Sequence, residues 1–182
     1  DTTLLIKPAH FAHFVLRVTD LKASIAFYEK LLGMHVVHES SFLAFMTYDE
    51  EHHRIALVVT PVADPSPPGA AGLDHVAYTF TSLETLLGSY LRLKSLGIAP
   101  VWSINHGPTT SLYYADPDDN RIELQVDNFA TAKQTQHFME SGAFATNPIG
   151  VEFDPDRLVA RFEAGDPLEE LKKQGSTSPV LD

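Results

Sequence analysis

Two short stretches that lie 62 residues apart decide how this sequence folds: Ala12-His13-Phe14-Val15-Leu16 and Asp74-His75-Val76-Ala77-Tyr78. Both have the β-branched and aromatic character of a strand. Each is followed by a turn and then by a segment with apolar residues at helical spacing, Ser24–Leu32 in the first case and Glu84–Leu96 in the second. Gly33 and Gly97 directly follow these segments, and a glycine at this position is typical of a helix end. An internal repeat of this kind indicates two copies of one structural module.

Three more strand-like runs follow each predicted helix, so each module reads βαβββ and the fold class is α+β. They are Met34–His38, Phe42–Tyr48 and Arg54–Val59 in the first module, and Ala99–Ser103, Thr110–Tyr114 and Arg121–Val126 in the second. The modules span residues 10–60 and 72–127. The segment between them, residues 61–71, is rich in Pro and Gly and is predicted to be a linker.

The repeat ends near Asn128, where the pattern changes. Residues 1–127 therefore form one predicted domain, and residues 128–182 form a C-terminal helical extension. Its predicted helices are Ala130–Glu140, Pro155–Glu163 and Pro167–Lys173, the last two with Pro at the first helical position. An apolar stripe in the middle helix, made by Leu158, Val159 and Phe162, must pack either on the repeats or on another subunit.

Composition excludes several classes of function. The 182 residues carry 24 acidic and 13 basic side chains, a net charge of −11, which disfavours binding to nucleic acids or anionic membranes. There is no apolar run near the roughly 20 residues that a membrane span needs, so we expect a cytoplasmic protein. With no cysteine and nine histidines, only His and carboxylate side chains remain as strong metal ligands.

The repeat places potential metal ligands at mirrored positions. Aligning the last strands of the two modules sets Glu123 against Ala56. If the modules pack about a pseudo-twofold axis, His13, Ala56, His75 and Glu123 converge on it. Two histidines and one carboxylate on one face hold Fe(II) or Mn(II), and Ala cannot ligate, so up to three coordination positions stay open. In the alternative interpretation, the histidines are structural and Glu123 faces solvent.

These features resemble a known family. The βαβββ duplication, the spacing of His13, His75 and Glu123, and the segment Tyr113-Tyr114-Ala-Asp-Pro-Asp-Asp-Asn-Arg-Ile-Glu-Leu are similar to the vicinal oxygen chelate superfamily over residues 10–127. The superfamily includes glyoxalase I, fosfomycin and bleomycin resistance proteins, methylmalonyl-CoA epimerase and type I extradiol dioxygenases. The resemblance implies that glyoxalase I and the epimerase carry a ligand where this chain has Ala56, whereas extradiol dioxygenases do not. The chain most resembles a compact single-domain extradiol dioxygenase.

The resemblance also implies three catalytic residues. His53, the second histidine of Glu51-His52-His53-Arg54, matches the acid/base residue that precedes the fourth strand in extradiol enzymes. His106, in Asn-His-Gly-Pro, matches a hydrogen-bond donor near the substrate, and Tyr113 matches an active-site tyrosine. In the alternative interpretation, the paired histidines form a solvated turn and the tyrosine belongs to an ordinary strand.

The predicted function is therefore an Fe(II)-dependent dioxygenase, with Mn(II) as the alternative metal, that inserts both atoms of O2 into a catechol such as 2,3-dihydroxybiphenyl. Such an enzyme acts in the breakdown of aromatic compounds, and the resemblance implies a homo-oligomer. Two alternatives stay open on the same scaffold. One is a metal-dependent lyase, isomerase or transferase, and the other is a resistance protein that sequesters its ligand.

Overall fold

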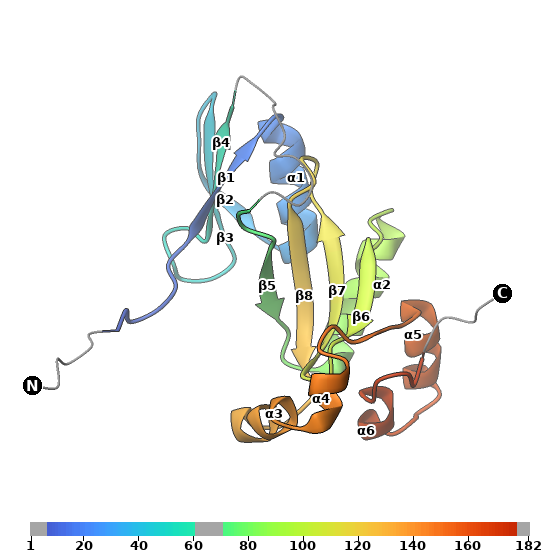
Figure 1. The fold of residues 1–182 in the computed structure, drawn as a ribbon. Helices are drawn as coiled ribbons and strands as arrows, with labels where there is room; N and C mark the ends of the chain where they lie inside the picture. The colour runs from blue at the N-terminus through green and yellow to red at the C-terminus, as the bar shows by residue number, and fades with distance from the viewer. Residues whose placement is uncertain (1–6, 61–70, 178–182) are drawn as a thin grey trace, which may run out of the picture. The chain divides into compact units, whose positions relative to one another are not determined.

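The computed structural model describes residues 7–60 and 71–177, and it divides into two compact units (Figure 1). Unit 1 comprises the chain up to Ala71 together with Asp116–Asp118, and unit 2 comprises Gly72–Ala115 together with the chain from Asp119 onward. The predicted linker, residues 61–71, lies outside the described residues except for its last member.

Unit 1 is one four-stranded sheet with one helix. Its elements in chain order are β1 (Phe14–Val18), α1 (Leu21–Leu32), β2 (His35–Glu39), β3 (Leu43–Thr47) and β4 (Ile55–Val59). The sheet order is β1-β4-β3-β2, with β1 parallel to β4. Helix α1 packs on β3 and β4 and starts three residues earlier than predicted, because Asp20 caps it by accepting a hydrogen bond from the Ala23 N–H. It ends at Gly33, whose φ of 64° closes the helix.

Unit 2 repeats this plan with five strands. Its elements are β5 (His75–Thr79), α2 (Leu83–Ser95), β6 (Trp102–Asn105), β7 (Thr109–Ala115) and β8 (Arg121–Asp127), and β9 (Val151–Glu152) from the extension pairs with the free edge of β6. The sheet order is β5-β8-β7-β6-β9. Helix α2 begins with a reciprocal capping box between Ser82 and Thr85 and packs on β8. Strand β9 was not predicted.

The register of the two parallel strand pairs matches the predicted repeat residue by residue. Val15 pairs with Ala56 in unit 1, and Ala77 pairs with Glu123 in unit 2. Because side chains alternate along a strand, His75 lies on the same sheet face as Ala77 and Glu123. Ala56 thus has the place in unit 1 that Glu123 has in unit 2. The α+β fold of paired βαβββ modules is confirmed.

The extension folds into α3 (Ala132–Met139), α4 (Gly142–Thr146), β9, α5 (Pro155–Glu163) and α6 (Leu168–Leu171), which Figure 1 shows beyond the end of β8 and beside β6. Helix α5 has the predicted bounds and packs on α2. Its Leu158 and Val159 are buried, so part of the predicted stripe packs within unit 2. Helix α6 is shorter than predicted, and Pro167 is its N-cap residue and not its first helical residue.

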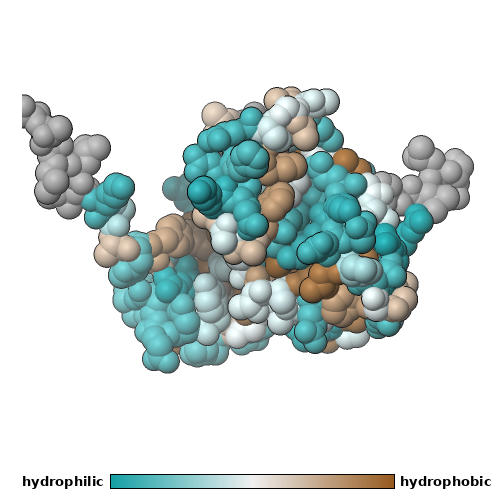
Figure 2. Space-filling model, turned by 90° about the horizontal axis from the view of Figure 1, so that it is seen from below, coloured by the Kyte–Doolittle hydropathy of each residue, from teal (hydrophilic) through white to brown (hydrophobic). Residues whose placement is uncertain are grey.

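Hydrophilic residues predominate on the face shown in Figure 2, and hydrophobic residues form small groups among them. No helix within residues 7–60 and 71–177 is long and apolar enough to cross a membrane.

The turn between β7 and β8 offers a test of local strain. Asp119 is the one non-glycine residue with a positive φ, 64°, in the part of the chain that the structure describes. A left-handed backbone conformation costs an L-residue about 1–2 kcal/mol, and less for Asp, whereas Gly adopts it freely. Gly also has more conformational entropy in the unfolded chain, which offsets part of this gain in stability. We therefore expect Asp119→Gly to raise the free energy of unfolding by about 0.5 kcal/mol, and Asp119→Val to lower it by about 1 kcal/mol. Urea denaturation of both variants measures this, and a Val variant as stable as the wild type would contradict the turn geometry.

Candidate active site

In unit 1, His53 lies in a stack of rings. Its imidazole stacks on Phe45 with ring centroids 4.4 Å apart and an interplanar angle of 16°, and its centroid is 4.1 Å from that of His13. Phe45 pairs with Ala56 across β3 and β4, so the stack lies on the Ala56 face of the sheet. His53 is only 9% exposed. This burial, and secondarily the neighbouring His13 and His52, lower the pKa of His53 below that of an ordinary histidine.

His52 lies beside His53 in the loop between β3 and β4. The two Nδ1 atoms are 2.6 Å apart, so one ring donates to the other. The structure thus brings His13 and His53 together within unit 1, and of the paired histidines His53 is buried whereas His52 is exposed.

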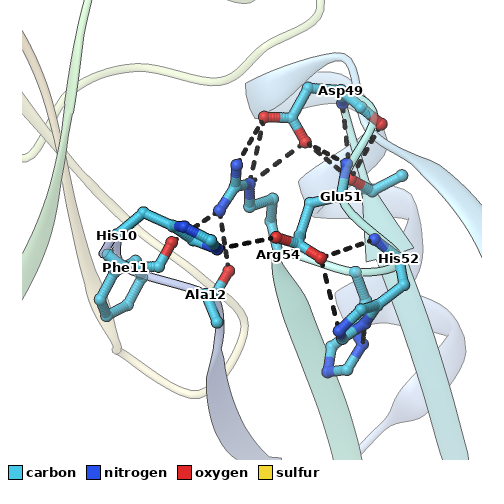
Figure 3. A network of polar contacts seen from close by, with 9 residues as sticks. His10, Phe11, Ala12, Asp49, Glu51, His52 and Arg54 are labelled. Carbon is cyan, nitrogen blue, oxygen red and sulfur yellow. Dashed lines mark hydrogen bonds and ion pairs between the residues drawn. The ribbon is translucent and has the colours of Figure 1, made fainter. Parts of the chain in front are cut away.

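Arg54 fixes the backbone that leads to His13. Figure 3 shows its guanidinium between Asp49 and the chain just before β1. It donates to the carbonyl oxygens of Phe11 at 2.7 Å and Ala12 at 2.9 Å. Its other N–H groups reach both carboxylate oxygens of Asp49, and this pairing lowers the pKa of that carboxyl. A single side chain therefore ties the loop that carries His53 to the segment that carries His13.

In unit 2, His75 is held between two carboxylates. Its Nδ1 is 2.7 Å from Asp74 Oδ2, and its Nε2 is 3.1 Å from Glu123 Oε2. The hydrogen bond that His75 donates to Asp74, together with the electrostatic attraction between the two side chains, lowers the pKa of Asp74. The Asp74 carboxylate is therefore the acceptor, and Nδ1 of His75 carries the proton. Nε2 of a neutral ring then presents a lone pair to an acceptor oxygen of Glu123. Two such groups at this distance require a proton or a cation between them.

Tyr113 and His106 lie next to this pair. Tyr113 Oη is 3.0 Å from His106 Nε2, and His106 Nε2 is 4.0 Å from Glu123 Oε1. Burial, and then the Glu123 carboxylate, raise the pKa of Tyr113 above its usual value, so its hydroxyl stays protonated. The ring of Trp102 lies 5.0 Å from that of Tyr113 and 5.8 Å from that of His106.

The predicted site residues thus form two groups, one in each unit. His13 and His53 lie together in unit 1, and the other four, His75, His106, Tyr113 and Glu123, lie together in unit 2. Within residues 7–60 and 71–177, no three metal-binding side chains form a complete group. Sequence reasoning missed Asp74 and Arg54, although Asp74 directly precedes one predicted ligand and Arg54 directly follows the predicted acid/base residue.

Comparison with known proteins identifies the family. Residues 10–124 match the Glyoxalase/Bleomycin resistance protein/Dioxygenase superfamily, which is more than half of the chain. The chain belongs to this superfamily. It is 48% identical to Biphenyl-2,3-diol 1,2-dioxygenase 2 and 44% identical to Biphenyl-2,3-diol 1,2-dioxygenase 3, both of Rhodococcus globerulus. Each alignment covers 88% of this chain and 85% of the relative.

Solved structures of the superfamily show the same fold. The fosfomycin resistance protein FosX of Listeria monocytogenes has a TM-score of 0.55 at 20% identity, and the alignment covers 71% of this chain and 99% of that one. The two Rhodococcus proteins instead match well beyond residue 124, so they share much of the C-terminal extension with this chain. The predicted superfamily is confirmed.

The lowered pKa of His53 gives a pH prediction for the metal-free chain. Because the folded chain binds this proton less readily than the unfolded chain, stability is lost as the pH falls through the ordinary histidine value, about 6.5. We expect His53→Phe to lose less stability than the wild type between about pH 7 and pH 5 in urea denaturation with chelator present. Substitution of the exposed His35 by Phe is the control and should keep the wild-type pH dependence. Equal losses in the wild type and His53→Phe would show that His53 is not the group concerned.

Proposed function

We propose that this protein is an extradiol ring-cleaving dioxygenase that acts on biphenyl-2,3-diol or a closely related catechol. The observation that carries the proposal is the 48% identity, over 88% of the chain, to an enzyme named for 1,2-dioxygenation of that diol. Carbons 2 and 3 of the diol bear the hydroxyls, so a 1,2-cleavage breaks the ring beside the diol pair. Both oxygen atoms of O2 enter the product. The cytoplasmic location and the homo-oligomeric state expected from the sequence stay predictions.

Membership of a dioxygenase family implies a metal, and the donor set of this chain fits one. Asp74 accepts a hydrogen bond from Nδ1 of His75, so the Nε2 lone pair of a neutral ring would face Glu123. A carboxylate behind a ligating histidine is the usual arrangement at protein metal sites, and a cation would relieve the contact between the two acceptor atoms. We propose Fe(II), since two histidines and one carboxylate with open positions are typical of non-haem iron oxygenases.

His13 is the proposed third ligand. The register that sets Ala77 against Glu123 in unit 2 sets Val15 against Ala56 in unit 1, which makes His13 the counterpart of His75. Ala56 offers no donor atom. The proposed set is therefore His13, His75 and Glu123, and the fourth mirrored position holds a methyl group.

Fe(II) held by His13, His75 and Glu123 would supply exchangeable coordination positions and the redox chemistry that the reaction with O2 needs. The other residues would handle protons and charge. His53, whose lowered pKa keeps it neutral near pH 7, would accept a proton from a substrate hydroxyl and return it later. Tyr113, which stays protonated, and the adjacent His106 would hold the substrate oxygen and stabilise charge on it.

Oxygen uptake with biphenyl-2,3-diol, together with the iron content of each variant, tests this proposal. Iron-loaded wild type should consume one O2 per diol and form a ring-opened product. His75→Ala and Glu123→Ala should lose the iron, because each removes a ligand. His53→Phe should keep iron and bind the diol while turnover falls about 100-fold or more. No oxygen uptake by the iron-loaded wild type would contradict the activity, and stoichiometric iron in both Ala variants would contradict the ligand set.

The place of Ala56 gives a test of the mirrored geometry. Ala56→Glu should add a fourth ligand, so metal should be harder to remove with a chelator while oxygen uptake collapses, because one exchangeable position is lost. Ala56→Leu, which adds volume without a donor, is the control for crowding and should not strengthen metal binding. A folded Ala56→Glu variant with normal iron and undiminished oxygen uptake would mean that residue 56 does not face the metal.

A further inference from the structure

The single tryptophan of the chain lies among the rings of the candidate active site. Trp102 pairs with Tyr113 across β6 and β7, and Tyr113 pairs with Glu123 across β7 and β8. Side chains of directly paired residues share a face of the sheet, so the indole lies on the face that carries Glu123. The indole centroid is 5.0 Å from that of Tyr113 and 5.8 Å from that of His106, and the last two centroids are 6.1 Å apart. All three distances are those of packed aromatic pairs.

The C-terminal extension holds the indole by its one polar atom. Trp102 Nε1 donates to Glu152 Oε1 at 2.8 Å, and Glu152 belongs to β9. A hydrogen bond to a carboxylate oxygen is among the stronger ones in proteins. Because an indole has a single N–H, this bond also fixes which way the ring is turned.

Strand β9 approaches β6 closely because a glycine precedes it. Gly150 has a φ of 120°, and a Cβ there would collide with the Asn105 carbonyl oxygen. Asn147 keeps this turn in place by accepting from the Gly150 N–H at 3.0 Å. In the same turn, the Ile149 carbonyl oxygen is hydrogen-bonded to Nδ1 of His106. The segment is therefore fixed to the sheet before β9 begins.

Unit 1 manages without this anchored ring. Phe45 has the place in unit 1 that Tyr113 has in unit 2, because each pairs with the mirrored position of the last strand. His38 pairs with Phe45 and so has the place of Trp102. His38 is exposed, and among the residues that the structure describes no strand lies beyond β2. The βαβββ plan therefore does not itself require the anchor.

We propose that Glu152 is a positioning residue that acts through Trp102. The carboxylate fixes the indole, and the indole keeps the rings of Tyr113 and His106 in place. The inference rests on the proposed function for its catalytic meaning, since these two residues would hold the substrate oxygen. The backbone pairing of β6 with β9 does not depend on the Glu152 side chain, so the role can be removed without removing the strand.

The hydrogen bond and its effect on the rings are measured in the metal-free chain. With one tryptophan, the indole N–H gives a single signal in a ¹H–¹⁵N spectrum. Glu152→Ala should move this signal toward that of free tryptophan, and Glu152→Gln, which keeps an acceptor oxygen, should leave it near the wild type. The aromatic signals of Tyr113, identified with Tyr113→Phe, should also move in Glu152→Ala, because the indole beside them turns. Unmoved indole or Tyr113 signals would overturn the proposal.

Glu140→Ala is the matched control. Glu140 is an exposed acid of the same extension and accepts from Gln136 Nε2 at 3.0 Å, so its loss removes the same charge and one hydrogen bond. The indole and Tyr113 signals should stay at their wild-type positions in this variant. Movement equal to that in Glu152→Ala would show that the signals report on charge and not on the bond, which would also overturn the proposal.

Turnover of the iron-loaded enzyme tests the catalytic meaning. Glu152→Ala should lower kcat about 10-fold through misplacement of the rings, while KM changes less, because the metal would supply most of the binding of the diol. Glu152→Gln should restore kcat. In a Trp102→Phe background, which has no indole N–H, Glu152→Ala should cause no further loss. A Glu152→Ala variant that loses stability in urea but keeps its kcat would contradict the positioning role, and equal losses in both backgrounds would contradict transmission through Trp102.

The two proposals fail in different ways. If the iron-loaded wild type consumes no O2 with the diol, but the indole and Tyr113 signals move as expected, the proposed activity is wrong and the positioning of the rings stands. If the diol is cleaved and Glu152→Ala leaves the signals and kcat unchanged, the proposed activity stands and Glu152 has no positioning role.

Discussion

The parallel pairing of the first and last strands in each module is the constraint on which the rest depends. Strand register and the two-residue repeat of the pleat together decide which side chains share a face. In unit 2 this pairing sets Ala77 against Glu123 and so brings His75 within 3.1 Å of the carboxylate. In unit 1 the same pairing sets Val15 against Ala56, so Ala56 has the place that Glu123 has in unit 2. A slip of one residue in either pair would turn these side chains to the helix-covered face.

Much of the fold could be predicted because the same local patterns of apolar spacing and capping residues occur twice in the chain. Apolar spacing and capping residues located α1 and α2 within a few residues, and Pro155 marked the start of α5. Strand β6 begins later than predicted, at Trp102, after Pro100, which has no N–H to donate. Strand β9 and helix α4 were missed because a two-residue strand and a five-residue helix leave almost no periodic signal.

Candidate site residues could be predicted where the side chain itself carries the chemistry, and not where a backbone carbonyl makes the contact. Histidines and a glutamate at mirrored positions are visible in the sequence, and so is their chemistry. The Ile149 carbonyl that orients His106, and the carbonyls of Phe11 and Ala12 that Arg54 holds, belong to residues whose type gives no hint of the role. Their signal lies in the neighbours: an Asn three residues before a Gly at positive φ, and an Arg directly after the paired histidines. The alignment with the Rhodococcus proteins reaches into the C-terminal extension, so these relatives share part of it.

We propose that both duplicated modules contribute ligands to a single metal and so act as one enzyme. The most direct measurement is a crystal structure of the iron-loaded protein with anomalous data collected at the iron absorption edge. We expect one anomalous peak per chain, in contact with His13, His75 and Glu123 and with no protein atom from residue 56. A peak bound by other side chains, or one held by His75 and Glu123 without His13, would contradict it.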